Sequence, residues 1–74
     1  MDSENKKWFF TEYETLVNLN EFCLFGLESS GDNFFAVVGR TKFDLKTELI
    51  FGLFSKEEEA RDYIKEIYNF LIST

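Results

Sequence analysis

The pattern of apolar and polar residues is most regular in the last part of the chain, from Ser55 to Thr74. Between Ser55 and Ile72 the chain contains neither Gly nor Pro, so nothing interrupts a helix. Ser55 followed by Glu58 also fits a capping box, in which each side chain accepts from a backbone N–H of the other residue. The sequence therefore predicts a C-terminal helix over residues 55–72.

The apolar side of this helix is wider than one supporting sheet requires. At ~100° per residue the apolar side chains spread over roughly 200°, whereas a helix on one sheet needs a stripe somewhat wider than ~100°. Tyr63 and Phe70 lie at one border of this arc. Tyr68 and Ile72 lie at the other border. Either the sheet curls round the helix or a second chain covers one border, and these four residues form the predicted oligomer interface.

Upstream of the helix, short apolar and aromatic runs are separated by turn signals. The predicted strands are 7–13, with an apolar continuation at 16–19, then 21–28, 34–40 and 48–54. Whether residues 8–19 form one bent strand or a hairpin stays open. The second strand is apolar on both faces, and the turn that follows it contains Gly31, which can supply a positive φ.

These elements predict one α+β domain over residues 1–74. Its order is β-β-β-β-α, a four-stranded antiparallel β-meander over residues 7–54 with the C-terminal α-helix packed across it. The connections are too short for parallel strand pairs. Residues 1–6 are polar and are expected to be disordered.

The aromatic content adds self-association to this picture. The 74 residues include ten Phe, three Tyr and one Trp, and 45% of the chain is hydrophobic. A domain this small cannot hide all of these rings, because small domains bury a smaller fraction of their surface. Exposed aromatic patches usually mark interfaces. We therefore expect a homo-oligomer, most simply a two-fold dimer.

Charge and hydropathy exclude several classes of partner. The formal net charge is −6, with 14 acidic and 8 basic residues, which argues against direct binding to nucleic acid or to an anionic membrane. No apolar run approaches the ~18 residues of a membrane span, and the polar start does not fit a signal peptide. The single cysteine, Cys23, fits a reducing compartment, so a cytoplasmic location is expected.

The residues for catalysis are few. The chain has no histidine, so the commonest general base and the histidine-paired nucleophiles are missing. The four glycines stand singly, without the spacing of a phosphate loop, and are expected to mark bulges or close approaches. Cys23 is expected to be a buried small apolar residue. The prediction is a protein without enzymatic activity, metal or cofactor.

A local basic cluster in this acidic chain supports one binding hypothesis. Arginine and lysine can contact phosphate, and nearby aromatic side chains can stack on a base. The hypothesis is that a homo-oligomer sequesters a small nucleotide signal between its subunits. The alternative is a solvated hairpin tip whose charges keep a sheet edge soluble. The candidate ligand-binding residues are Trp8, Tyr13, Arg40, Thr41, Lys42 and Lys46.

The polar side of the predicted helix supports a second hypothesis. Glu58, Asp62 and Glu66 belong to an acidic face that could occupy the basic groove of a nucleic-acid-handling host protein. The alternative is ordinary mixed surface charge, because Arg61 and Lys65 interrupt the acidic residues.

The order of these segments resembles that of many short proteins of phages and mobile elements. The likeness rests on an aromatic first strand, the segment Leu16-Val17-Asn18-Leu19, a hairpin, and Phe54-Ser55-Lys56-Glu57-Glu58-Glu59-Ala60 opening the last helix. Some proteins of that kind inhibit bacterial defence, either by blocking a host protein or by absorbing nucleotide signals. The resemblance implies an inhibitor or regulator in the host cytoplasm, and it assigns no site residues. A structural assembly module is the third alternative.

Overall fold

The computed structural model describes residues 7–73, and it has the predicted α+β architecture with one C-terminal helix. The expected disorder of residues 1–6 lies outside the described residues. The strands are β1 (Trp8–Phe10), β2 (Leu16–Asn18), β3 (Phe22–Ser30), β4 (Phe34–Thr41) and β5 (Glu48–Phe54), and the helix is α1 (Glu57–Ile72). A short 3-10 turn, Leu19–Glu21, joins β2 to β3.

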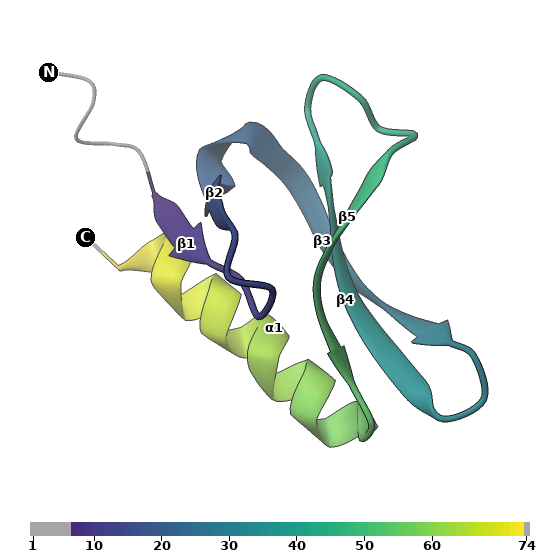
Figure 1. The fold of residues 1–74 in the computed structure, drawn as a ribbon. Coiled ribbons are helices and arrows are strands. Elements are labelled where there is room, and N and C mark those ends of the chain that lie inside the picture. Colours follow the sequence, from purple (N-terminus) through teal and green to yellow (C-terminus); the bar gives the residue numbers. More distant parts are fainter. Residues whose placement is uncertain (1–6, 74) are drawn as a thin grey trace, which may run out of the picture.

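The strands form two antiparallel sheets, which corrects the predicted single four-stranded meander (Figure 1). β3, β4 and β5 make a three-stranded meander, and β1 pairs only with β2 among the described strands. The chain reverses after β1 because the Thr11 hydroxyl accepts from the backbone N–H groups of Tyr13 and Thr15, and Glu14 has a φ of 60°. Residues 8–19 therefore form a hairpin, which answers the question that the sequence left open.

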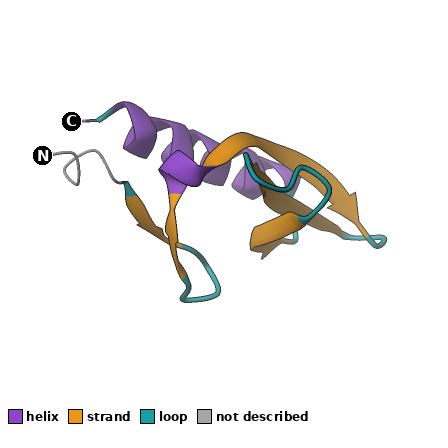
Figure 2. Cartoon of the chain, turned by 90° about the horizontal axis from the view of Figure 1, so that it is seen from above, coloured by secondary structure: helices purple, strands orange, loops and turns teal. Residues whose placement is uncertain are grey.

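Helix α1 packs along one side of the three-stranded sheet, as Figure 2 shows, and the core lies between them. Phe51 is the extra residue of a β-bulge, because the β4 neighbours Val37 and Val38 pair with Gly52 and Ile50. The Phe51 ring is fully buried.

Gly39 marks the close approach predicted for strand glycines. A Cβ at Gly39 would lie 2.9–3.0 Å from the rings of Phe22, Phe25 and Phe51. These rings fill the space above the glycine, and the Phe51 ring centre lies 5.3 Å from that of Phe22 and 5.4 Å from that of Phe25. Gly31 has the positive φ, 68°, expected for the β3–β4 turn.

The β1–β2 hairpin covers one border of the helix. The ring of Phe9 lies 5.8 Å from that of Tyr63 and 5.5 Å from that of Phe70, both in edge-on geometry. At the opposite border Tyr68 and Ile72 are 61% and 58% exposed. The wide apolar arc is thus covered by the chain itself at the first border and left open at the second.

Two local expectations are wrong. The helix begins at Glu57 and not at Ser55, and its N-cap residue, Lys56, makes no side-chain capping bond. β5 continues to Phe54, so Ser55 and Lys56 are used for the turn and the capping box does not form. Cys23 is exposed and not buried, because it lies at an irregularity of an outer strand.

Candidate functional site

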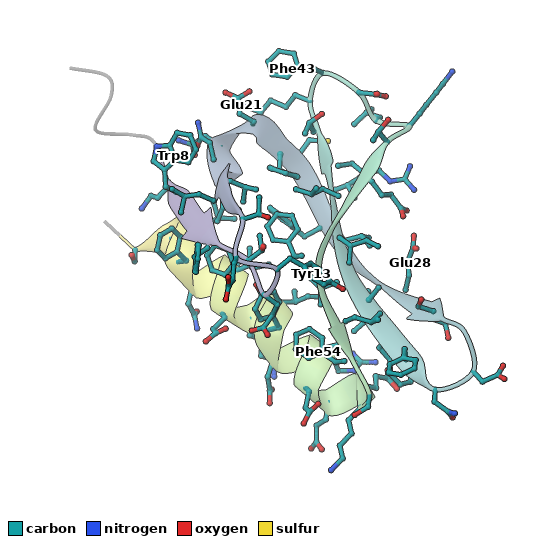
Figure 3. The ribbon with its side chains drawn as sticks, viewed as in Figure 1. Trp8, Tyr13, Glu21, Glu28, Phe43 and Phe54 are labelled. Atoms are coloured by element: carbon teal, nitrogen blue, oxygen red, sulfur yellow. The ribbon has the colours of Figure 1, made fainter. Side chains whose placement is uncertain are left out.

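A cleft of about 340 Å³ lies between the end of β5 and α1. We call it the acidic cleft, and its lining residues are Phe54, Glu59, Asp62, Tyr63 and Glu66. The three carboxylates are exposed and follow one another along one side of α1, at spacings of three and four residues. Figure 3 shows the Phe54 side chain beside the first turns of the helix.

Two aromatic rings form the apolar part of the acidic cleft. The ring centres of Phe54 and Tyr63 are 5.2 Å apart, with 47° between the ring planes. Gly52 allows this arrangement, because a Cβ there would lie 2.9 Å from the Phe54 ring and 3.0 Å from Cγ of Glu12. The missing side chain at Gly52 therefore leaves room for the Phe54 ring beside Tyr63.

Tyr63 is a neutral side chain in negatively charged surroundings. Burial, and next the negative charge of Glu12, raise the pKa of Tyr63 to about 12. Its hydroxyl is buried and has no hydrogen-bond partner among residues 7–73. The nearby N–H of Glu12 donates to the carbonyl of Phe51 at 3.0 Å. Tyr63 thus keeps its proton at physiological pH.

This arrangement suits an organic cation. A guanidinium or ammonium group can donate to the carboxylates of Glu59, Asp62 and Glu66 while its flat or apolar part lies on an aromatic ring. A metal ion fits less well, since no three carboxylate, thiol or imidazole groups of the described chain converge closely enough to hold one.

The predicted basic cluster lies at the tip of the β4–β5 hairpin, residues 41–47, and two of its members build that tip. Arg40 donates to the carbonyl of Leu45 at 2.8 Å and forms an ion pair of 2.6 Å with Glu48. The Thr41 hydroxyl accepts from the N–H of Asp44 at 3.1 Å. Arg40 and Thr41 are therefore occupied in shaping the loop.

The other candidate ligand residues are exposed but dispersed. Lys42 and Lys46 are on the tip, together with Phe43, which is 82% exposed. Trp8 starts the β1–β2 hairpin, where it pairs with Asn18, and Tyr13 lies in the turn at the other end of that hairpin (Figure 3). The fold thus brings the tip residues together and separates the two aromatic candidates.

The sequence did not indicate that the carboxylates of Glu28 and Glu48 lie close together. A hydrogen bond between Glu28 and Glu48 raises the pKa of Glu28 and lowers that of Glu48, and the neighbouring Arg40 lowers the pKa of Glu48 further. Glu28 pairs with Ala36 and Glu48 pairs with Arg40, four residues further along β4, so neither the sequence nor the strand register alone shows that the two side chains meet.

Comparison with protein-family models, with curated proteins and with solved structures finds no match to this chain. Among the described residues, no helix is both long and apolar enough to cross a membrane.

Proposed function

We propose that this protein has no enzymatic activity and acts by binding, with the acidic cleft docking onto a basic segment of another protein. The observation that supports this most is the placement of Glu59, Asp62 and Glu66 beside two aromatic rings in one cleft. Acidic side chains alone would indicate only a solvated surface. The rings of Phe54 and Tyr63 add a surface on which an arginine can stack.

The charge of the whole chain favours the same class of partner. A net charge of −6 attracts a basic protein and raises its association rate at low salt. Two of the cleft residues, Asp62 and Glu66, belong to the acidic face singled out in the sequence. Occupying the basic surface of a nucleic-acid-handling protein would block that protein. The resemblance to phage and mobile-element proteins supports an inhibitor of host defence in the host cytoplasm.

Nucleotide sequestration stays a prediction with less support. Arg40, the residue best suited to hold a phosphate, already binds Leu45 and Glu48. Isothermal titration with a broad panel of cyclic and linear nucleotides tests this prediction, and an absence of heat across the panel would refute it.

Self-association is also part of the proposed function. Large apolar side chains remain exposed at the open border of α1, where Tyr68 and Ile72 lie. These positions are away from the acidic cleft, so a homo-oligomer could bind its partner at more than one site.

The docking proposal is tested with a fluorescent arginine-rich peptide and fluorescence anisotropy on the full chain. The cleft variant carries E59Q, D62N and E66Q, and a matched control carries E14Q, D32N and E21Q. Both variants lose three carboxylates, but only the first loses them from the cleft. We expect the cleft variant to bind at least ~10-fold more weakly and the control to change about 2-fold, because exposed charges away from a contact contribute little.

Two outcomes would contradict the proposal. Equal weakening by the cleft variant and the control would reduce the binding to general charge attraction. A protein partner captured from host extract by the tagged chain, and captured equally well after charge reversal at Asp62 and Glu66, would show that docking uses another surface.

A further inference from the structure

β3 is an outer strand whose free edge is poorly protected. It runs from Phe22 to Ser30 and, within residues 7–73, pairs with β4 alone. The free edge of such a strand exposes unpaired N–H and C=O groups at about every second residue. Monomeric proteins usually protect such an edge with lysine, proline or a bulge. β3 carries one charged residue, Glu28, and its one irregularity is confined to its start, near Cys23.

The opposite edge of the same sheet is different. The N–H of Glu12, in the turn after β1, donates to the carbonyl of Phe51 at 3.0 Å, so the N-terminal hairpin reaches the edge of β5. β3 is therefore the edge at which a further strand can be added.

An apolar groove between β3 and α1 follows this free edge. One part, of about 290 Å³, is lined by residues that include Leu24 and Phe25 of β3 and Ile64, Tyr68 and Leu71 of α1. A second part, of about 260 Å³, is lined by Leu27, Arg61, Ile64 and Lys65. The groove thus combines unpaired backbone with apolar side chains, the two components of strand addition.

Charge indicates which occupant fits this groove. Its charged lining residues are Arg61 and Lys65, whereas the carboxylates of Glu59, Asp62 and Glu66 line the cleft at the other border of α1. A basic partner is therefore attracted to the acidic cleft and repelled at the groove. Arg61 and Lys65 offset the one carboxylate of β3, Glu28. Two copies of a chain with a net charge of −6 therefore repel each other less along β3 than at a surface rich in carboxylates.

We infer that two copies of this chain pair antiparallel along β3. This pairing joins two three-stranded sheets into one of six strands and sets the two α1 helices side by side over the seam. A strand that pairs antiparallel with its own copy generates a two-fold axis, so the assembly closes as a dimer. The inference rests on the self-association within the proposed function and is independent of the basic partner.

The dimer makes use of the open border of the helix. Tyr68, exposed beside the groove, is covered by the second copy, while Tyr63 and Phe70 remain covered by Phe9 of their own chain. The acidic clefts stay at the outer borders of the two helices. Each dimer then presents two clefts to a basic partner.

The first test substitutes lysine on both sides of the seam, at Gly26 of β3 and at Tyr68 of α1. A Cβ at Gly26 meets no atom within 4 Å, so G26K fits the folded chain. The matched control, L53K with N69K, adds two lysines to exposed positions of β5 and α1 away from the seam. Circular dichroism and a thermal melt confirm that both variants fold.

Sedimentation velocity over a concentration series gives the association constant. The wild type and the control are expected to sediment as particles with twice the 8.8 kDa mass of one chain. G26K/Y68K is expected to associate at least ~10-fold more weakly, because like charges facing each other across strands are destabilising.

The second test places a thiol at the seam. In a C23S background, G26C is compared with L53C, using a short bismaleimide cross-linker. We expect cross-linked dimers from G26C and very few from L53C, because only position 26 lies close to its own copy.

The outcomes separate this inference from the rest of the proposed function. A dimeric wild type, weakened by G26K/Y68K and cross-linked through G26C, supports pairing along β3. A monomer at every concentration overturns both the pairing and the self-association. A dimer that survives G26K/Y68K, cross-links only through L53C or grows into larger oligomers overturns the pairing alone. Binding of the arginine-rich peptide is measured separately and does not depend on these results.

Discussion

Alanine at three of the strand glycines tests the packing of the core and the cleft. Gly39 lies under the rings of Phe22, Phe25 and Phe51, and Gly52 lies under Phe54, with a new Cβ 2.9–3.0 Å from the nearest ring atoms in each case. Gly26 is the control, because a Cβ there meets no atom within 4 Å.

The expected free energies follow from these distances. Overpacking a core costs about 1–3 kcal/mol, and alanine gains about 0.5–1 kcal/mol over glycine in a strand. We therefore expect G39A and G52A each to lower the free energy of unfolding by about 1–2 kcal/mol. G26A should leave it unchanged or raise it by about 0.5–1 kcal/mol, since it restricts the unfolded chain without a clash.

Urea denaturation at one fixed protein concentration measures all three variants. A change of about 1 kcal/mol shifts the melting temperature of a domain of this size by roughly 4–8 °C, so a thermal melt gives an independent reading. A double-mutant cycle of G52A with F54L adds a specific check, because the smaller side chain makes room for the new Cβ and should recover part of the loss. A G39A variant as stable as the wild type, or a G26A variant that loses as much stability as G39A, would show that these rings do not pack closely on Gly39.

Three further predictions concern the first border of the helix. Y63F removes a buried hydroxyl that has no partner among the described residues, so urea denaturation should show unchanged stability or a gain of up to about 1 kcal/mol; a clear loss would reveal a hydrogen bond. The pKa of Tyr63 is raised from 10.0 to about 12, so above pH 10 the folded chain holds this proton while the unfolded chain releases it. The contribution of Tyr63 to the free energy of unfolding therefore falls as the pH rises from 10 to about 12. Ultraviolet titration should show one tyrosine that ionises near pH 12 in the wild type and is missing from Y63F. F9A removes the ring that packs on Tyr63 and Phe70. It should lower the free energy of unfolding by about 2–3 kcal/mol, less than the loss of a fully buried phenylalanine. An unchanged urea midpoint would show that the hairpin does not stabilise this border.

The parts of the fold that depend on residues close together in the sequence could be predicted. The uninterrupted helix and the Gly31 turn depend on neighbouring residues, and both are present. The division into two sheets depends on the Thr11 hydrogen bonds and on the positive φ of Glu14. Glutamate seldom adopts a positive φ, so the sequence did not indicate this turn. The last strand ends at Phe54 as predicted, but the helix starts two residues later than predicted because Ser55 and Lys56 form the turn between β5 and α1.

The sequence indicated the acidic half of the candidate site but not its aromatic half. The carboxylates of Asp62 and Glu66 share a helix face by spacing, so the sequence indicated them. Phe54 joins them only because the turn between β5 and α1 folds its ring against Tyr63. In the same way, the commitment of Arg40 to Leu45 and Glu48 follows from the path of the hairpin tip, so the sequence could not show that the guanidinium was already occupied.

The most direct test of the docking proposal is a ¹H–¹⁵N NMR titration of the full chain with the arginine-rich peptide. The account predicts that the largest shifts of backbone amides fall on Phe54 and on the cleft residues of α1, Glu59 to Glu66, and that they vanish in the E59Q/D62N/E66Q variant. Shifts centred instead on Asp32, on Glu14 or on the hairpin tip around Phe43 would contradict it.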